Sequence, residues 1–131
     1  MKLVITTIEI PVTNLERSQA WYTDKLGLNQ TWTDGESMAM FELPDAGSPN
    51  LFLVRTEDST RLAIPNAATG VIHGVIDFAV EDIDAIHTSL RERGVDVSDL
   101  PSAGEDDGPG PRGFGFKDPD GNLFGVCQYG E

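Results

Sequence analysis

Two carboxylates occupy the same place in two similar stretches of this sequence. Glu9 lies in residues 7–14 and Asp77 in residues 75–82, and the two stretches align without a gap. Brought to one surface, these carboxylates could hold a cation or act as a general acid and base. Two alternatives involve no ligand: the carboxylates pair with arginines, or they lie at a hydrated subunit interface. The arginines in question are Arg55 and Arg112.

An internal repeat explains why the two positions match. Apolar and polar residues alternate in both stretches, which is typical of a strand with one buried face. Asn14 and Asp82 follow these strands as N-caps of two helices, and Gly27 and Gly94 end those helices. Three short strands are predicted after each helix. They lie at 29–33, 37–43 and 50–55, and again at 95–98, 112–117 and 123–129.

The elements of the two halves define the fold class. The sequence predicts an α+β fold, in which two tandem βαβββ modules form one cupped mixed sheet with the helices on its convex face. Turn signals at Asp34-Gly35 and at residues 118–122 separate the strands. We expect a single domain over 1–131, with module one at about 1–56, a linker at about 57–70 and module two at about 71–131.

Strand alternation assigns side chains to two faces of the sheet. The residues expected under the helices are Ile8, Ile10, Val12, Phe52, Val54, Ile76, Phe78, Val80, Phe124 and Val126. The residues expected on the concave face are Thr7, Glu9, Pro11, Leu51, Leu53, Val75, Asp77, Ala79, Leu123, Gly125 and Cys127. The two carboxylates of the repeat are therefore expected on the concave face.

Composition excludes several classes of function. The formal net charge is −13, from 22 acidic and 9 basic residues, so nucleic acids and anionic membranes are poor partners. No apolar run is long enough for a membrane span, and the N-terminus lacks signal-peptide features, so a cytoplasmic location is expected. The single cysteine, Cys127, excludes an internal disulfide; it is either a reactive thiol or a small core residue of the last strand.

Other polar residues suggest weaker sites. His87 falls on the apolar stripe of the second helix and is interpreted as a half-buried helix residue. His73 is interpreted as a surface residue at a strand start, although it could join Glu9 and Asp77 in a metal site. The loop 99–111 is either a lid or a plain solvated loop, and its acidic run 105–108 does not match an EF-hand.

Three segments carry a resemblance to a known family. They are residues 10–18 (IPVTNLERS), 21–28 (WYTDKLGL) and 116–123 (FKDPDGNL). With the tandem modules, they resemble the vicinal oxygen chelate superfamily, which includes glyoxalase I, bleomycin-resistance proteins and extradiol dioxygenases. The resemblance implies metal ligands at four positions in the metal-dependent members. Those positions are matched here by Thr7, Leu53, Val75 and Gly125.

These four residues offer almost no side-chain ligands, so the sequence favours a binding protein over an enzyme. The hypothesis is a metal-free homodimer of the bleomycin-resistance type, without a cofactor, that holds a cationic or antibiotic-like small molecule. The expected ligand pocket comprises Thr7, Glu9, Trp32, Leu53, Val75, Asp77 and Gly125. The alternative is a glyoxalase-like lyase or dioxygenase that uses an unrecognised metal or the Glu9/Asp77 pair.

Overall fold

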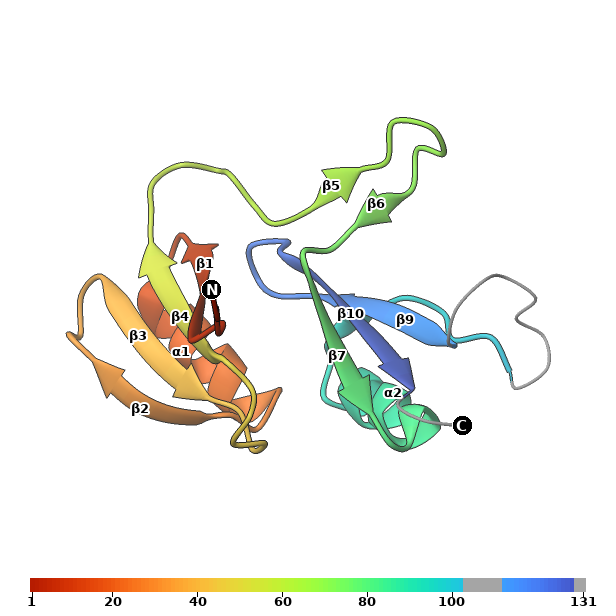
Figure 1. The fold of residues 1–131 in the computed structure, drawn as a ribbon, viewed down its shortest axis with the longest axis horizontal. Coiled ribbons are helices and arrows are strands. Elements are labelled where there is room, and N and C mark those ends of the chain that lie inside the picture. The colour runs from red at the N-terminus through yellow and green to blue at the C-terminus, as the bar shows by residue number, and fades with distance from the viewer. Residues whose placement is uncertain (103–111, 129–131) are drawn as a thin grey trace. The chain divides into compact units, whose positions relative to one another are not determined.

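The computed structural model describes residues 1–102 and 112–128, and the rest of the predicted loop 99–111 lies outside this part. The chain divides into two compact units, which we call unit one (Met1–Arg61) and unit two (Leu62–Glu131). Each unit contains one helix and one four-stranded sheet in the described residues (Figure 1). Neither helix combines the length and apolar character that a bilayer crossing requires.

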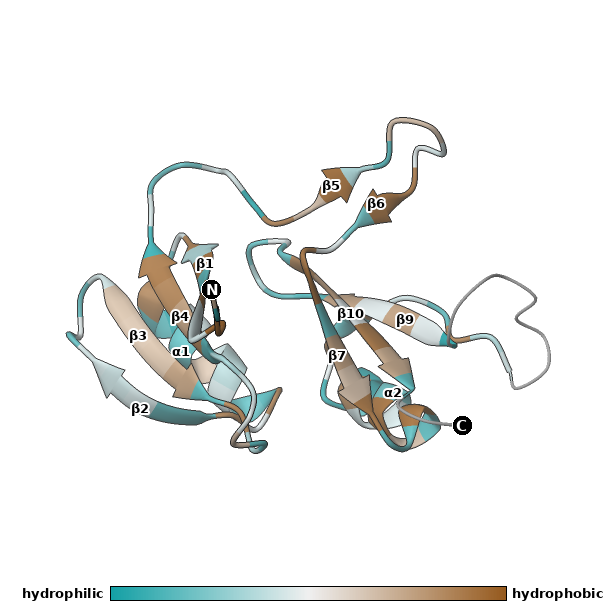
Figure 2. Ribbon diagram, viewed as in Figure 1, coloured by the Kyte–Doolittle hydropathy of each residue, from teal (hydrophilic) through white to brown (hydrophobic). Residues whose placement is uncertain are grey.

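Unit one is a βαβββ module. Its elements are β1 (Thr7–Val12), α1 (Leu15–Asp24), β2 (Asn29–Thr33), β3 (Met38–Glu42) and β4 (Asn50–Arg55). The strand order is β1-β4-β3-β2, with β1 parallel to β4 and the other pairs antiparallel. Figure 2 shows that β4 is mainly hydrophobic and β2 mainly hydrophilic, as suits an inner strand and an edge strand respectively.

Unit two repeats this plan after a short two-stranded ribbon. Its elements are β5 (Ile64–Pro65), β6 (Ile72–His73), β7 (Ile76–Val80), α2 (Ile83–Glu92), β8 (Asp96–Val97), β9 (Gly113–Lys117) and β10 (Leu123–Gln128). The four-stranded sheet has the order β7-β10-β9-β8, and β5 pairs with β6. Part of the expected linker therefore forms a ribbon with the first residues of module two.

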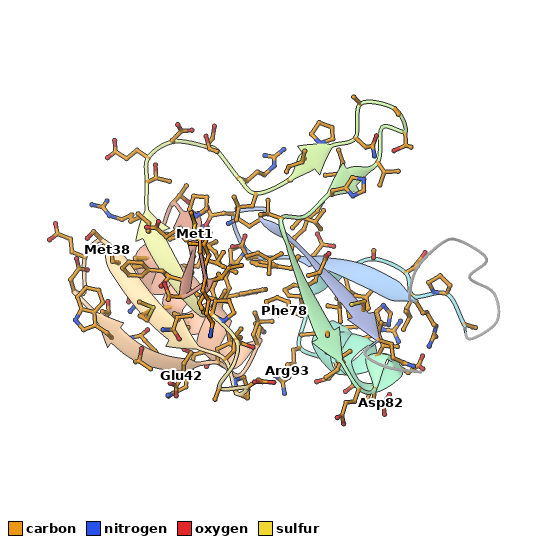
Figure 3. The ribbon with its side chains drawn as sticks, in the orientation of Figure 1. Met1, Met38, Glu42, Phe78, Asp82 and Arg93 are labelled. Carbon is orange, nitrogen blue, oxygen red and sulfur yellow. The ribbon has the colours of Figure 1, made fainter. Side chains whose placement is uncertain are left out.

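The α+β class and the tandem modules are confirmed. Hydrogen bonding divides the strands of the modules between two four-stranded sheets, and not the one continuous sheet that was predicted. Both helices begin where a side chain caps them: Asn14 Oδ1 accepts a hydrogen bond from Arg17 N at 3.0 Å, and Asp82 Oδ1 from Ala85 N at 3.1 Å. Figure 3 labels Asp82 at the start of α2.

The core of unit one lies between α1 and one face of its sheet. Tyr22 of α1 is fully buried, and its ring centroid lies 5.9 Å from that of Phe41. The buried strand residues around them are Ile10, Val12, Ala39, Leu51 and Leu53. The burial of Ile10 and Val12 confirms the face predicted for β1.

The faces predicted for β4 are wrong. Leu51 and Leu53 are fully buried on the helix side, while Phe52 and Val54 are half-buried on the opposite side. Four consecutive apolar residues give no alternation from which to choose a face. In such a strand a register error of one residue exchanges the two faces completely.

The core of unit two matches the predicted faces. Phe124 and Val126 of β10 are buried, and the Phe124 ring lies 5.2 Å from that of Phe116. His87 of α2 is also buried, with its ring 4.7 Å from Phe114 and its Nε2 2.8 Å from the carbonyl oxygen of Ser98. His87 is therefore a helix residue, as predicted, but it is more buried than the predicted half-buried position.

The turn between β2 and β3 is built around one carboxylate. Asp34 accepts hydrogen bonds from the Ser37 hydroxyl at 2.5 Å and from the backbone N–H groups of Glu36, Met38 and Ser37 at 2.8–3.0 Å. Gly35 adopts a φ of 76°, which confirms the Asp34-Gly35 turn signal. The hydrogen bonds, that of the Ser37 hydroxyl first, hold the Asp34 pKa well below its usual range.

This turn predicts a specific loss of stability in acid. A lowered pKa in the folded state stabilises the fold above the ordinary aspartate pKa of about 3.9, and this stabilisation is lost as the pH falls through the lowered value. Asp34→Asn keeps an acceptor but removes the charge, so its stability should depend less on pH in this window than that of the wild type. Urea denaturation at several acid pH values measures this, with Glu36→Gln as the control. Equal slopes for Asp34→Asn and the wild type would contradict the assignment.

Candidate functional site

The side of each four-stranded sheet that its helix leaves uncovered, here called the helix-free face, carries the candidate site. In unit one a row of side chains crosses this face from β1 to β2. Strand register places them as neighbours in the order Glu9, Phe52, Met40 and Trp32. Trp32 is 49% exposed, and its ring centroid lies 6.3 Å from that of Phe52. The row thus joins an exposed carboxylate to an aromatic and thioether surface.

A cavity of about 450 Å³ lies at the Glu9 end of this row. Its lining residues are Glu9, Ile10, Pro11, Val54, Thr56, Asp58 and Thr60. Asp58 Oδ1 accepts hydrogen bonds from the Thr60 hydroxyl at 2.6 Å and from Thr60 N at 2.8 Å, and these bonds lower the Asp58 pKa. The lining contains two carboxylates and no basic side chain, so it favours a positively charged group.

Unit two has a matching row on its helix-free face. Asp77 of β7 is opposite Gly125 of β10, and Gly125 is opposite Gly115 of β9. Ser98 completes the row, because its N–H donates to Gly115 O and its hydroxyl oxygen accepts from Gly115 N, both at 2.8 Å. A side chain at position 125 would overlap the Asp77 carboxylate, so Gly125 leaves the space in which this carboxylate lies.

The two rows occupy equivalent positions in the internal repeat, but their side chains are large in unit one and small in unit two. Since Glu9 corresponds to Asp77, their strand partners Phe52 and Gly125 also correspond. The rows read Glu, Phe, Met, Trp in unit one and Asp, Gly, Gly, Ser in unit two. The row of unit one therefore consists of large side chains, whereas the row of unit two leaves open space.

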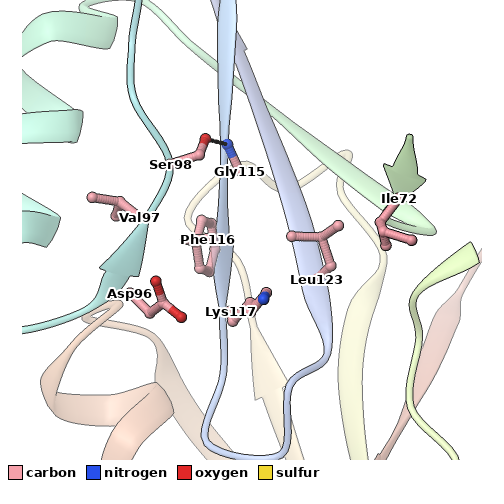
Figure 4. Close-up of a pocket in the computed structure, with 8 residues that line it drawn as sticks. All are labelled: Ile72, Asp96, Val97, Ser98, Gly115, Phe116, Lys117 and Leu123. Carbon is pink, nitrogen blue, oxygen red and sulfur yellow. Dashed lines mark hydrogen bonds between the residues drawn. The ribbon is translucent and has the colours of Figure 1, made fainter. Parts of the chain in front are cut away.

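A second cavity, of about 310 Å³, lies beside the row of small residues in unit two (Figure 4). Its lining residues are Ile72, Asp96, Val97, Ser98, Gly115, Phe116, Lys117 and Leu123. Gly115 contributes backbone only, which keeps the space between Ser98 and Leu123 open. None of the seven residues predicted for the ligand pocket lines this second cavity.

The predicted pocket residues fall into three groups. Thr7, Glu9 and Trp32 lie on the helix-free face or edge of unit one, and Val75, Asp77 and Gly125 belong to the helix-free side of unit two. Leu53 is fully buried on the helix side of β4, so it is a core residue. Convergence of the first two groups stays a prediction.

Arg112 and His73 were both considered as neighbours of the two carboxylates. Arg112 forms a two-point ion pair with Asp84, at 3.0 and 2.9 Å. His73 is exposed on β6, where it pairs with Ile64, and this confirms the interpretation of a surface residue in a short strand. Cys127 is half-buried on the helix-free face of β10.

A family model of the Glyoxalase/Bleomycin resistance protein/Dioxygenase superfamily matches residues 4–126, nearly the whole chain. The chain belongs to this superfamily. A relative in the same size class is the uncharacterized protein YraH of Bacillus subtilis (strain 168), which is 29% identical over 134 residues, with 98% of each chain covered.

Solved structures of superfamily type share the fold. TnmS3, an antibiotic binding protein from Streptomyces sp. CB03234, matches with a TM-score of 0.72 and 23% identity, covering 98% of each chain. The bleomycin-binding protein of Streptomyces verticillus, solved with copper(II)-bleomycin, matches with a TM-score of 0.69 and 18% identity over 99% of each chain. At these identities the likeness establishes the fold alone.

The donor set of this superfamily member does not fit a metal at the positions that the resemblance implies. The equivalence of the rows places Phe52, in place of Leu53, at the closing-strand position of module one. Thr7, Phe52, Val75 and Gly125 supply one hydroxyl between them, and a divalent ion needs several donors. Among residues 1–102 and 112–128 no three His, Cys, Asp or Glu side chains group closely enough to hold an ion.

Four residues of the candidate site were not predicted from the sequence: Met40 of the row in unit one, and Asp58, Ser98 and Lys117, which line the two cavities. The available signal was the repeat itself. Extending it from the opening strands to the later strands would have aligned Met40 with Gly115 and revealed the contrast in size.

Proposed function

We propose that this superfamily member is a small-molecule-binding protein that holds its ligand on the helix-free face of unit one without a metal ion. The observation that carries the proposal is the row from Glu9 to Trp32 beside an acidic cavity. Such a surface combines a large apolar contact with a few fixed polar groups, as ligand sites generally do.

The row favours a ligand with a planar apolar body and a cationic group. Four neighbouring strands at about 4.8 Å spacing give the row a length of about 14 Å. A flat ring system can stack on Trp32 and Phe52 and contact the polarizable sulfur of Met40. A cationic group at the other end would meet Glu9 and Asp58. The antibiotic- and bleomycin-binding proteins of similar fold support a ligand of the antibiotic type.

We also propose that the protein acts as a homodimer. Large apolar side chains remain exposed in both units, which a two-fold partner could cover. They include Leu3, Val4, Ile5, Ile64 and Val71, each more than half exposed.

Berberine, a planar aromatic cation that does not chelate metals, is a suitable probe. In a Trp21→Phe background Trp32 is the sole tryptophan, and berberine should quench its fluorescence on binding. Glu9→Gln should weaken the affinity about tenfold, because a charge-assisted contact contributes about 1.5 kcal/mol. Glu16→Gln removes the same charge from α1 and should leave the affinity unchanged.

Naphthalenesulfonate, an aromatic anion, provides the ligand control and should bind much more weakly than berberine. Tighter binding of the anion, or equal effects of Glu9→Gln and Glu16→Gln on berberine, would contradict a cation site at Glu9.

A further inference from the structure

The cavity of unit two differs in chemistry from the acidic cavity of unit one. Its floor is Gly115, and its apolar walls come from Ile72 and Leu123 (Figure 4). Val97 and Phe116 also border it, but strand register places their side chains on the helix side of the sheet, where Phe116 packs on Phe124. Polar groups are contributed by Asp96, Ser98 and Lys117. At about 310 Å³ the space is near the lower limit of typical ligand pockets, which suits a small molecule.

The walls of this cavity are fixed by hydrogen bonds. Ser98 is tied to Gly115 by the two bonds described above, and its carbonyl oxygen accepts a bond from His87 of α2. On the opposite side, Leu62 N donates to Asn122 Oδ1 at 2.8 Å, and Leu123 N donates to Leu62 O at 2.9 Å. A site with anchored walls loses little conformational freedom when a ligand binds.

The charges of this cavity are complementary and available. Asp96 and Lys117 are direct partners on β8 and β9, both exposed at the rim. Within the described part of the chain, Asp96 and Lys117 form no ion pair with each other or with any other residue. The Ser98 hydroxyl oxygen accepts from Gly115 N, and its hydrogen can still be donated to a ligand.

We propose that this cavity binds a small zwitterion of the α-amino-acid type with an apolar side chain. Lys117 and the Ser98 hydroxyl bind its carboxylate, and Asp96 binds its ammonium group. The apolar side chain lies over Gly115, between Leu123 and Ile72. The site belongs entirely to unit two, so a failure of the cation site proposed in unit one would not affect it.

An amide NMR titration of the full chain with L-leucine tests this site. The amide signals of Ser98, Gly115, Lys117 and Leu123 should shift, while those of the row in unit one should not. The methyl ester of L-leucine lacks the carboxylate and N-acetyl-L-leucine lacks the ammonium group. Each should bind about tenfold more weakly than L-leucine, since each loses a charge-assisted contact.

Two variants and a control complete the experiment. Lys117→Gln should weaken L-leucine binding about tenfold, whereas Lys2→Gln removes the same charge from the exposed N-terminal segment and should have no effect. Gly115→Val places methyl groups in the cavity and should abolish the shifts, with the dispersion of the spectrum reporting that the fold is intact. Absence of shifts at the four amides would overturn the proposal. Equal binding of L-leucine and its two derivatives, or equal effects of both lysine variants, would also overturn it.

Discussion

Shortening Leu53 to alanine is expected to lower the free energy of unfolding by about 3 kcal/mol, because it opens a cavity between the sheet and α1. Leu53 is fully buried beside Ile10 and Ala39. Phe52→Ala, one residue earlier, removes more atoms but from the half-buried helix-free face, and should cost only about 1 kcal/mol. Urea denaturation followed by tryptophan fluorescence measures both, since Trp21 and Trp32 both belong to unit one.

The order of these two costs decides which face of β4 is available to a ligand. If Phe52→Ala lowered the free energy of unfolding more than Leu53→Ala, Leu53 would have to lie on the helix-free face. The equivalence of Phe52 with Gly125 would then fail as well.

Replacing Asn122 with alanine is expected to cost about 3 kcal/mol in unit two. Asn122 is fully buried; its Nδ2 donates to Asp118 Oδ2 at 2.8 Å, and its Oδ1 accepts from Leu62 N at 2.8 Å. The substitution leaves a buried carboxylate oxygen and a backbone N–H without these partners, and each such loss costs about 1–3 kcal/mol. Thermal and urea denaturation followed by circular dichroism provide the measurement.

Asn29→Ala is the matched control for this substitution. Asn29 donates to Glu42 Oε1 at 2.9 Å from an exposed edge strand, so its loss should change stability by no more than about 0.5 kcal/mol. Similar costs for the two asparagines would show that the turn at 118–122 does not anchor the chain at Leu62.

The elements of the fold were predictable because local signals agreed with one another. Asn14 and Asp82 cap the helices as expected, and the predicted strands lie within a residue or two of the observed ones. The β5–β6 ribbon was missed because each of its strands has two residues, too few to show alternation.

The candidate site was predictable only in part. Glu9, Asp77 and Gly125 lie on helix-free faces as predicted, because apolar and polar residues alternate clearly in the opening strands. The face of Leu53 depends on how the loop before β4 sets the register, which no residue of that strand reveals. The cavity of unit two exists because Gly115 has no side chain. Its charged residues, Asp96 and Lys117, lie on two strands, and they can be recognised as neighbours only when the pairing of these strands is known.

The central claim, a ligand site in unit one that needs no metal, is tested most directly by calorimetry with berberine. The protein is dialysed against a chelator and titrated, then titrated again after addition of Zn²⁺ or Mn²⁺. We predict equal affinities in all three titrations, with Glu9→Gln weakening each to the same extent. Binding that appears only when a metal ion is present would contradict the claim.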